Sequence, residues 1–185
     1  MRVISGTAGR IRLEAPKSLA RPSTDRLREA LFSILGNRVV DSQALDLFAG
    51  SGALGIEALS RGASKAVFVD QDRGAVISLQ GNLERTRLTE RAQVVRQDVF
   101  AWLKRRAGLR FDLVFADPPY VKGPHDPDFA AMLLGESVLE HFVEDGGMVI
   151  VETGQGGPPK HAGGWRLVES RRYGGSHLHF FEPAR

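Results

Sequence analysis

The chain has 185 residues, of which 42% are hydrophobic, 25 are Lys or Arg and 22 are Asp or Glu, which suits a single domain over residues 1–185 with a core of its own. It contains no cysteine, which excludes disulfides, thiolate metal sites and thiol redox chemistry. Its apolar runs are too short to span a membrane and its N-terminus lacks a signal-peptide profile, so we expect a cytoplasmic protein.

The N-terminal segment carries the excess of positive charge. Residues 1–38 hold eight Lys or Arg against three Asp or Glu, and the rest of the chain is slightly acidic. Residues 1–20 predict a β-hairpin with a turn at residues 6–9, here named the N-terminal arm. A basic arm suits contact with RNA phosphates, although a solvated surface would carry the same charges. The candidate RNA-binding residues are Arg2, Arg10, Arg12, Lys17 and Arg26.

The next elements are a helix, a strand and a glycine-rich turn. Ser23 or Thr24 is a suitable N-cap for a helix that ends at Gly36. An apolar strand from about Ala44 then leads into the turn, and a helix that ends near Gly62 follows it.

The glycine turn is compatible with two kinds of cofactor. Gly50, Gly52 and Gly55 satisfy G-x-G-x-x-G, so a nicotinamide dinucleotide is one candidate. Asp46 precedes the glycines, however, and a carboxylate there opposes a pyrophosphate on the helix N-terminus. S-adenosylmethionine carries an ammonium and a sulfonium and no phosphate, so its methionine end suits Asp46. A plain turn or capping role for Asp46 is the alternative.

Two further predicted strands, over residues 65–70 and 92–96, also lead into acids. Asp70 lies about twenty residues beyond the glycine turn, where βαβ units recognise ribose hydroxyls. Asp98 could accept a hydrogen bond from the adenine amino group, or it could cap the following helix as Asp72 could. Three acids at successive strand ends together favour the nucleoside and methionine parts of S-adenosylmethionine.

The strand predicted over residues 111–116 leads into Asp117-Pro118-Pro119-Tyr120. Consecutive prolines fix φ and remove backbone donors, so the carbonyls in this turn are held in a set direction. An exocyclic amino group could donate one hydrogen to the Asp117 carboxylate and the other to the Pro118 carbonyl, while Tyr120 stacks on the flipped base. The turn therefore predicts methylation of an amine, although so short a motif could also be an ordinary loop.

The remaining pattern completes an α/β fold. It predicts a loop, a helix over 129–142, a strand over 148–152, and a hairpin of residues 165–172 and 176–182. The expected fold is a Rossmann-like, doubly wound, mostly parallel sheet with an antiparallel C-terminal strand, plus the N-terminal β-hairpin extension. His177 and His179 share one face of the last strand and are expected to be structural, so no metal site is predicted.

These motifs resemble the RsmD family of class I S-adenosylmethionine-dependent methyltransferases over nearly the whole chain. The resemblance implies methyl transfer to the exocyclic N2 of a guanine in 16S rRNA, guanine 966 in the family's usual naming, within the small ribosomal subunit and by a monomer. Many relatives carry Glu where this chain has Asp70, whose reach is shorter. The matching segments are Arg2-Val3-Ile4-Ser5-Gly6, Arg21-Pro22-Ser23-Thr24-Asp25-Arg26, Asp46-Leu47-Phe48-Ala49-Gly50-Ser51-Gly52 and Asp117-Pro118-Pro119-Tyr120.

The resemblance also implies roles for individual residues in a catalytic core over residues 21–185. It places Arg21 and Thr24 near the methionine carboxylate of the cofactor, although capping explains Thr24 equally well. The expected catalytic residues are Asp117, Pro118, Pro119 and Tyr120. The expected cofactor-binding residues are Asp46, Phe48, Ala49, Gly50, Ser51, Gly52, Asp70, Asp98, Arg21 and Thr24.

Three other functions remain open at this point. A DNA or RNA adenine-N6 or cytosine-N4 methyltransferase could use the same turn, because any exocyclic amine fits it. An NAD-dependent dehydrogenase would explain the glycines and leave Asp46 and the Asp117 turn without a role. A non-catalytic RNA-binding module would explain the basic arm and would not need a cofactor cleft.

Overall fold

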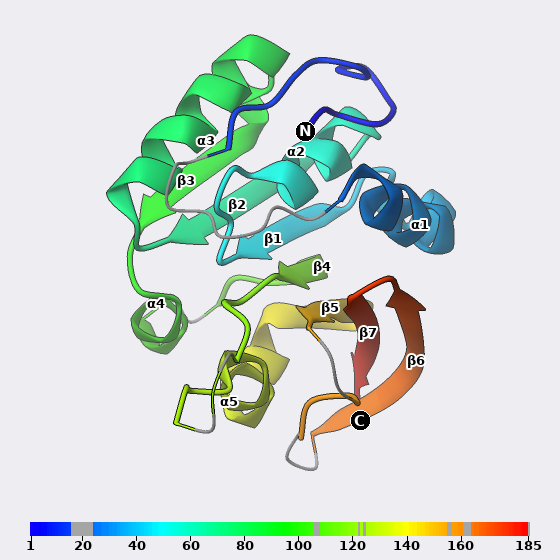
Figure 1. Ribbon diagram of the computed structural model, residues 1–185, viewed down its shortest axis with the longest axis vertical. Coiled ribbons are helices and arrows are strands. Elements are labelled where there is room, and N and C mark those ends of the chain that lie inside the picture. The colour runs from blue at the N-terminus through cyan, green and yellow to red at the C-terminus, as the bar shows by residue number, and fades with distance from the viewer. Residues whose placement is uncertain are drawn as a thin grey trace.

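The computed structural model describes residues 1–15, 24–105, 108–121, 123, 125–154, 157–160 and 164–184. Within these residues, seven strands form one sheet in the order β3-β2-β1-β4-β5-β7-β6 (Figure 1). β1 to β5 are parallel, and β7 is antiparallel to both of its neighbours. The predicted Rossmann-like sheet is confirmed. The strands are β1 (Gln43–Leu47), β2 (Lys65–Asp70), β3 (Ala92–Arg96), β4 (Phe111–Ala116), β5 (Val143–Thr153), β6 (Trp165–Tyr173) and β7 (Ser176–Pro183).

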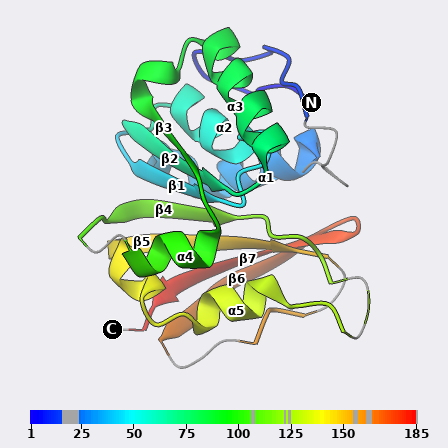
Figure 2. The same cartoon turned by 90° about the vertical axis from the view of Figure 1, so that its left-hand side faces the viewer.

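Helices cover both faces of the sheet (Figure 2). α1, α2 and α3 pack on one face with Phe115 of β4, and α4 and α5 pack on the other with Val114. Burial on both faces explains the apolar runs of the inner strands β1, β2 and β4, whereas the edge strand β3 has no fully buried residue. None of the helices in the described segments is long and apolar enough to cross a membrane. The helices are α1 (Asp25–Leu35), η1 (Gly36–Val39), α2 (Ala53–Ser60), α3 (Arg73–Thr86), η2 (Thr89–Arg91), α4 (Val99–Arg105), α5 (Phe129–Gly135) and η3 (Leu139–Phe142).

The two largest differences from the predicted bounds concern the helix predicted over 129–142 and the strand β5. The helix predicted over 129–142 is divided, because the backbone at Glu136 is extended with ψ of 103° and the second part is the 3₁₀ helix η3. Gly135 and Ser137 favour a helix only weakly, so the packing of two short pieces decides the outcome. β5 begins at Val143 rather than at 148, because the strand continues through Gly146 at φ +78° and its pairing with β4 shifts there.

The N-terminal arm pairs with itself as predicted, but without regular strands. Within residues 1–15, Arg2 and Arg12 form one antiparallel bridge. The Val3 amide donates to the Ile11 carbonyl at 2.9 Å. The described part of the arm is therefore a short, irregular hairpin.

This hairpin lies against α2 and does not project from the molecule. Gly6 has φ of +83°, and a Cβ on it would lie 1.9 Å from the Ser60 carbonyl oxygen, so only glycine permits this approach. Farther along α2, the buried Glu57 carboxylate accepts hydrogen bonds from the Ile4 and Ser5 amides at 2.7 and 3.1 Å. The arm is thus held by polar contacts with the C-terminal half of α2.

A buried arginine joins the arm to α1. Arg28 is fully buried and donates to the Asp25 carboxylate and to the Arg2 carbonyl, both at 2.7 Å. Its guanidinium also lies 4.0 Å from Glu57. Removing one member of such a cluster leaves an uncompensated charge, so the cluster fixes how the arm sits on the helices.

Candidate functional site

Two turns leave adjacent parallel strands at the carboxyl edge of the sheet. β1 pairs with β4 so that Leu47 lies opposite Ala116. The glycine turn after Leu47 and the Asp117 turn after Ala116 therefore begin side by side. The strand order reverses between these strands, because the chain passes from β1 toward β2 on one side and from β4 toward β5 on the other. Such a switch point is the usual ligand site of an open α/β sheet.

The glycine turn has a backbone that strongly favours glycine. Gly50 and Gly52 have φ of +54° and +76°, and Phe48 adopts +59°. A Cβ on Gly52 would lie 2.2 Å from Cδ1 of Leu79, so the missing side chain lets the turn approach α3. The turn is a close-fitting backbone cradle that brings together the predicted residues Phe48, Ala49, Gly50, Ser51 and Gly52.

Asp46 is buried beneath this cradle. Its Oδ2 accepts a hydrogen bond from the Gly55 amide at 2.8 Å, in the first turn of α2. Burial raises the pKa of Asp46 to about 8, and the charge of Asp70 adds to the rise. The capping role considered for Asp46 is therefore present, and its carboxyl group is neutral over part of the physiological pH range.

Asp70 also contacts the glycine turn. One of its oxygens accepts from the Gly50 amide at 2.8 Å, and the other accepts from the Asp72 amide at 2.8 Å. The end of β2 is thereby tied to the end of β1, where a ribose bound over the turn would lie. The two remaining lone-pair directions of such a carboxylate can accept further hydrogen bonds.

Asp98 caps α4, which was the alternative to its adenine role. Its Oδ1 accepts from the Ala101 amide at 2.9 Å, and its side chain is exposed.

An aromatic cluster lies beside Asp98. The ring centroids of Phe48 and Phe100 are 6.2 Å apart, and Phe129 lies 6.0 and 6.2 Å from them. Phe100 and Phe129 had no predicted role, and they give this side of the site an apolar surface that suits a purine.

Tyr120, the last residue of the Asp117 turn, is held by its hydroxyl group against residues of β5 and β7. Pro118 is buried and Asp117 and Tyr120 are partly exposed. The Tyr120 hydroxyl donates to Glu152 Oε1 at 2.5 Å and lies 3.2 Å from Ser176 Oγ. Burial, then the charges of Asp117 and Glu152, raise the pKa of Tyr120 well above its usual range, so the hydroxyl remains a donor. The sequence pattern assigned a role to the ring alone and missed Glu152 and Ser176.

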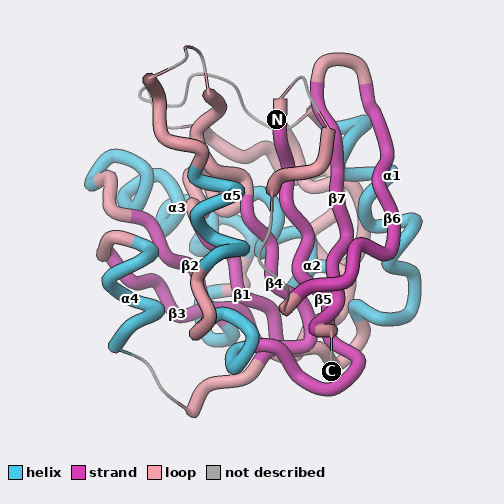
Figure 3. The backbone as a smooth tube through the Cα atoms, turned by 90° about the horizontal axis from the view of Figure 1, so that it is seen from below, coloured by secondary structure: helices cyan, strands magenta, loops and turns pink. Residues whose placement is uncertain are grey.

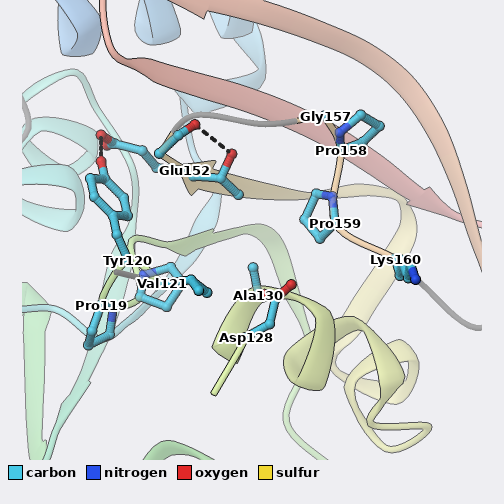
Figure 4. Close-up of a pocket in the computed structure, with 13 residues that line it drawn as sticks. Pro119, Tyr120, Val121, Asp128, Ala130, Glu152, Gly157, Pro158, Pro159 and Lys160 are labelled. Atoms are coloured by element: carbon cyan, nitrogen blue, oxygen red, sulfur yellow. Dashed lines mark hydrogen bonds between the residues drawn. The ribbon is translucent and has the colours of Figure 1, made fainter. Parts of the chain in front are cut away.

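A cavity of about 430 Å³ opens beside Tyr120 (Figure 4). Its wall comes from the Asp117 turn, the start of α5, the end of β5 and the segment that follows β5. The volume is in the range of small-molecule sites and suits a single base. The lining includes Pro118, Tyr120, Asp128, Glu152, Gly154 and Lys160.

Two histidines secure the cavity wall from behind, where β7 and β6 form a hairpin next to β5 (Figure 3). Nδ1 of His177 donates to the Gly154 carbonyl at 2.9 Å. The buried His179 lies 3.0 Å from Thr153 Oγ1 and 2.9 Å from Ser170 Oγ. Burial lowers the pKa of His179 to about 4, so it is neutral and structural. Among the described residues, no cluster of His, Asp or Glu could hold a metal ion.

Four of the five predicted RNA-binding residues are described by the structure, and they lie along the helical layer that carries the N-terminal arm. Arg10, Arg12 and Arg26 are exposed, as is Arg2, which forms an ion pair with Asp25. Lys17 and Arg21 fall outside the described residues.

Thr24 is the N-cap of α1, and its hydroxyl accepts from the Leu27 amide at 3.2 Å. The capping explanation for Thr24 is confirmed, and its contact with a cofactor stays a prediction.

Comparisons with known proteins place the chain in a family. The family model described as Conserved hypothetical protein 95 matches residues 1–182. The chain belongs to this family, the RsmD family. Ribosomal RNA small subunit methyltransferase D of Escherichia coli K12 is 39% identical over 153 residues, which cover 82% of this chain and 71% of that protein. The protein of the same name from Haemophilus influenzae is 35% identical over 156 residues, covering 83% and 78%.

Solved structures share the fold of this chain. A structure of a hypothetical protein from Thermus thermophilus is 38% identical, with a TM-score of 0.81, and the match covers 97% of this chain and 98% of that one. An RNA methyltransferase from Salinibacter ruber in complex with S-adenosyl-L-homocysteine has 14% identity and a TM-score of 0.66, over 89% and 95% of the chains. The second likeness extends the shared fold to more distant methyltransferases.

The Tyr120 hydroxyl gives a first test of the site geometry. Tyr120→Phe should lower the free energy of unfolding by about 1.5–3 kcal/mol, because the buried Glu152 carboxylate loses a charge-assisted hydrogen bond. Urea denaturation measures the change. Tyr173→Phe, at the end of β6, is the matched control and should change stability by less than about 0.5 kcal/mol. Equal effects of the two substitutions would show that the hydroxyl does not anchor Tyr120.

Proposed function

We propose that this protein transfers a methyl group from S-adenosylmethionine to the exocyclic N2 of one guanine in 16S rRNA, guanine 966 in the usual naming of the family. Its partner is the partly or fully assembled small ribosomal subunit, and it acts as a monomer in the cytoplasm. The observation that carries the proposal is the adjacency of the glycine turn and the Asp117 turn at the ends of β1 and β4. Family membership supports rRNA as the substrate.

The residues around the glycine turn fit S-adenosylmethionine better than a dinucleotide. Gly50 and Gly52 provide a cradle of backbone, and Asp70 lies where it can meet a ribose. Asp46 adds a carboxyl group beneath the cradle, and its ionised form, which grows toward pH 8, favours a cationic methionine end. The aromatic cluster beside Asp98 suits the adenine ring. When bound, the cofactor supplies an electrophilic methyl group.

The acceptor side of the site favours guanine among the possible amines. Pro118 and Glu152 line the cavity, and Asp117 lies close enough to Tyr120 for its charge to raise the pKa of that hydroxyl. Guanine presents donors at both N1 and N2 on its Watson–Crick edge, whereas adenine N1 and cytosine N3 are acceptors beside their amino groups. The acceptor wall formed by the Pro118 carbonyl and the two carboxylates favours the edge of guanine over those of the other two bases, and Lys160 is a donor in the same lining.

The side chains contribute alignment more than bond chemistry. Tyr120 stacks on the extruded base, and Asp117 with the Pro118 carbonyl accepts the two amino hydrogens. With S-adenosylmethionine held over the glycine turn, these contacts would direct the lone pair of N2 toward the methyl group that the cofactor supplies. The cofactor's thioether would be the leaving group, and the surplus amine proton would pass to solvent. Positioning of this kind can lower the activation barrier by several kcal/mol.

The rival functions explain less of the geometry. A dehydrogenase would place its pyrophosphate over a carboxyl group and leave the cavity beside Tyr120 unused. A non-catalytic RNA-binding module needs neither the glycine cradle nor that cavity. Adenine-N6 or cytosine-N4 transfer remains the nearest rival, and the acceptor wall argues against it.

The pKa of Asp46 makes cofactor binding pH-dependent. A pKa of about 8 means that Asp46 is mostly protonated at pH 6.5 and ionised above pH 8. If the carboxylate attracts the methionine ammonium, affinity for S-adenosylmethionine should rise from pH 6.5 to 8 by up to about tenfold per unit. Calorimetric titration measures the trend. Asp46→Asn should abolish it, and 5′-methylthioadenosine, which lacks the ammonium, should not show it. A pH-independent wild-type affinity would contradict this role.

Asp117 tests the chemistry itself. Asp117→Ala should abolish methyl transfer while the protein still folds and cofactor affinity remains near wild type, because the carboxylate contacts the acceptor base. The assay follows labelled methyl transfer to small-subunit particles from cells that lack the enzyme, with the modified nucleotide mapped. Asp112→Ala, at the opposite end of β4, is the control and should retain activity. Near-normal turnover in Asp117→Ala would overturn the proposed mechanism.

The exposed arginines of the N-terminal arm test the RNA contact. Reversing Arg10 and Arg12 to Glu should weaken RNA binding and flatten the plot of log affinity against log salt by about 0.7–0.9 per lost phosphate contact. Cofactor affinity without RNA should not change. Reversing Lys104 and Arg105, on α4 across the sheet, is the charge-matched control. Equal losses in both double variants would mean that net charge alone attracts the RNA.

A further inference from the structure

The N-terminal arm and the glycine turn share one buried side chain. Asn82 is a residue of α3 and is fully buried. Its Nδ2 donates to the Glu14 carbonyl and to the Ser51 carbonyl, both at 2.9 Å. Its Oδ1 accepts from the Glu14 amide at 2.8 Å and from Arg85 Nη1 at 3.0 Å. The arm and the cofactor cradle therefore meet at a single amide group.

This amide makes every hydrogen bond that it can. A primary amide has two N–H donors and two acceptor positions, and in Asn82 all four are used. Because the group is buried, water cannot replace a lost partner without a rearrangement. A displacement of Glu14 would break two of these bonds and free the side chain to turn away from Ser51. The position of the arm thus bears directly on the Ser51 carbonyl.

Other contacts also join the arm to the turn and to α3. Ser51 Oγ lies 3.4 Å from the Met1 sulfur, at the other end of the described arm. Arg85 forms an ion pair with Glu14 at 2.8 Å, which holds the arm against α3. Ser78 Oγ donates to the same Glu14 carbonyl at 2.9 Å, and this bond joins α3 to the arm without involving Ser51. Asn82 is the residue of this group that bonds to both sides.

We propose that Asn82 is a positioning residue that couples RNA contact at the N-terminal arm to cofactor binding at the glycine turn. The inference rests on the proposed function, in which the exposed arginines of the arm meet RNA phosphates. RNA that holds the arm in its docked position also holds Ser51, so it strengthens cofactor binding. By linkage, the cofactor strengthens RNA binding by the same factor.

Equilibrium dialysis of labelled S-adenosylhomocysteine against the full chain tests the coupling, with and without saturating small-subunit particles from cells that lack the enzyme. The wild-type protein should bind at least about fivefold more tightly with particles present, the lower end of typical coupling. Asn82→Ala should reduce this ratio to near one. Ser78→Ala, which loosens the arm without touching Ser51, should keep it. A wild-type ratio of one, or an Asn82→Ala ratio equal to wild type, would overturn the inference.

A second pair of variants leaves α3 intact in case Asn82→Ala does not fold. Glu14→Pro removes the amide hydrogen that Asn82 accepts, whereas Glu14→Ala keeps it, and both remove the ion pair with Arg85. The ratio of cofactor affinities with and without particles should be lower in Glu14→Pro than in Glu14→Ala. Equal ratios in the two variants would overturn the inference. Methyl transfer to the same particles separates the two proposals. If the wild-type protein transfers methyl normally but its cofactor affinity is the same with and without particles, the coupling alone is contradicted. If the wild-type protein transfers no methyl group, the proposed function is contradicted.

Discussion

The pairing of β1 with β4 is the constraint on which the rest of the site depends. Leu47 lies opposite Ala116, so the two turns that follow leave the sheet at the same level. α2 then packs on one face of the sheet and α5 on the other. The turns must diverge, and the crevice between them has the cofactor cradle on one wall and the Asp117 turn on the other. A shift of one residue in this register would separate donor and acceptor.

Buried acids make these turns rigid. Asp46 accepts from the Gly55 amide, Glu57 accepts from the amides of the N-terminal arm, and Glu152 accepts from the Tyr120 hydroxyl. Burying a carboxyl group costs several kcal/mol unless its oxygens are hydrogen-bonded, so each acid selects the backbone arrangement that supplies its donors. The cost of desolvating these carboxyl groups thereby favours one fixed backbone geometry around the crevice.

The sequence predicted those parts of the fold that depend on short-range pattern. β2, β3 and β4 have the predicted bounds, because their apolar runs are flanked by polar residues and turns. The start of β5 was missed because the strand continues through Gly146, a residue that ordinarily ends one. The positions of Asp46, Asp70 and Asp117 at the ends of parallel strands were predictable, and their roles stay predictions. Glu152 and Ser176 meet Tyr120 across 32 and 56 residues, and no local pattern records such a contact.

The docking of the N-terminal arm on α3 has a consequence for the order in which the protein forms during synthesis. Glu14 and Asn82 are 68 residues apart in the chain, so the arm leaves the ribosome long before its partner exists. Closing so long a loop carries an entropic cost that the short contacts of the arm repay only once α2 and α3 are in place. A segment made early is thus among the later ones to be fixed. Until then the Ser51 carbonyl lacks its amide partner, and the cofactor cradle of the nascent chain is incomplete.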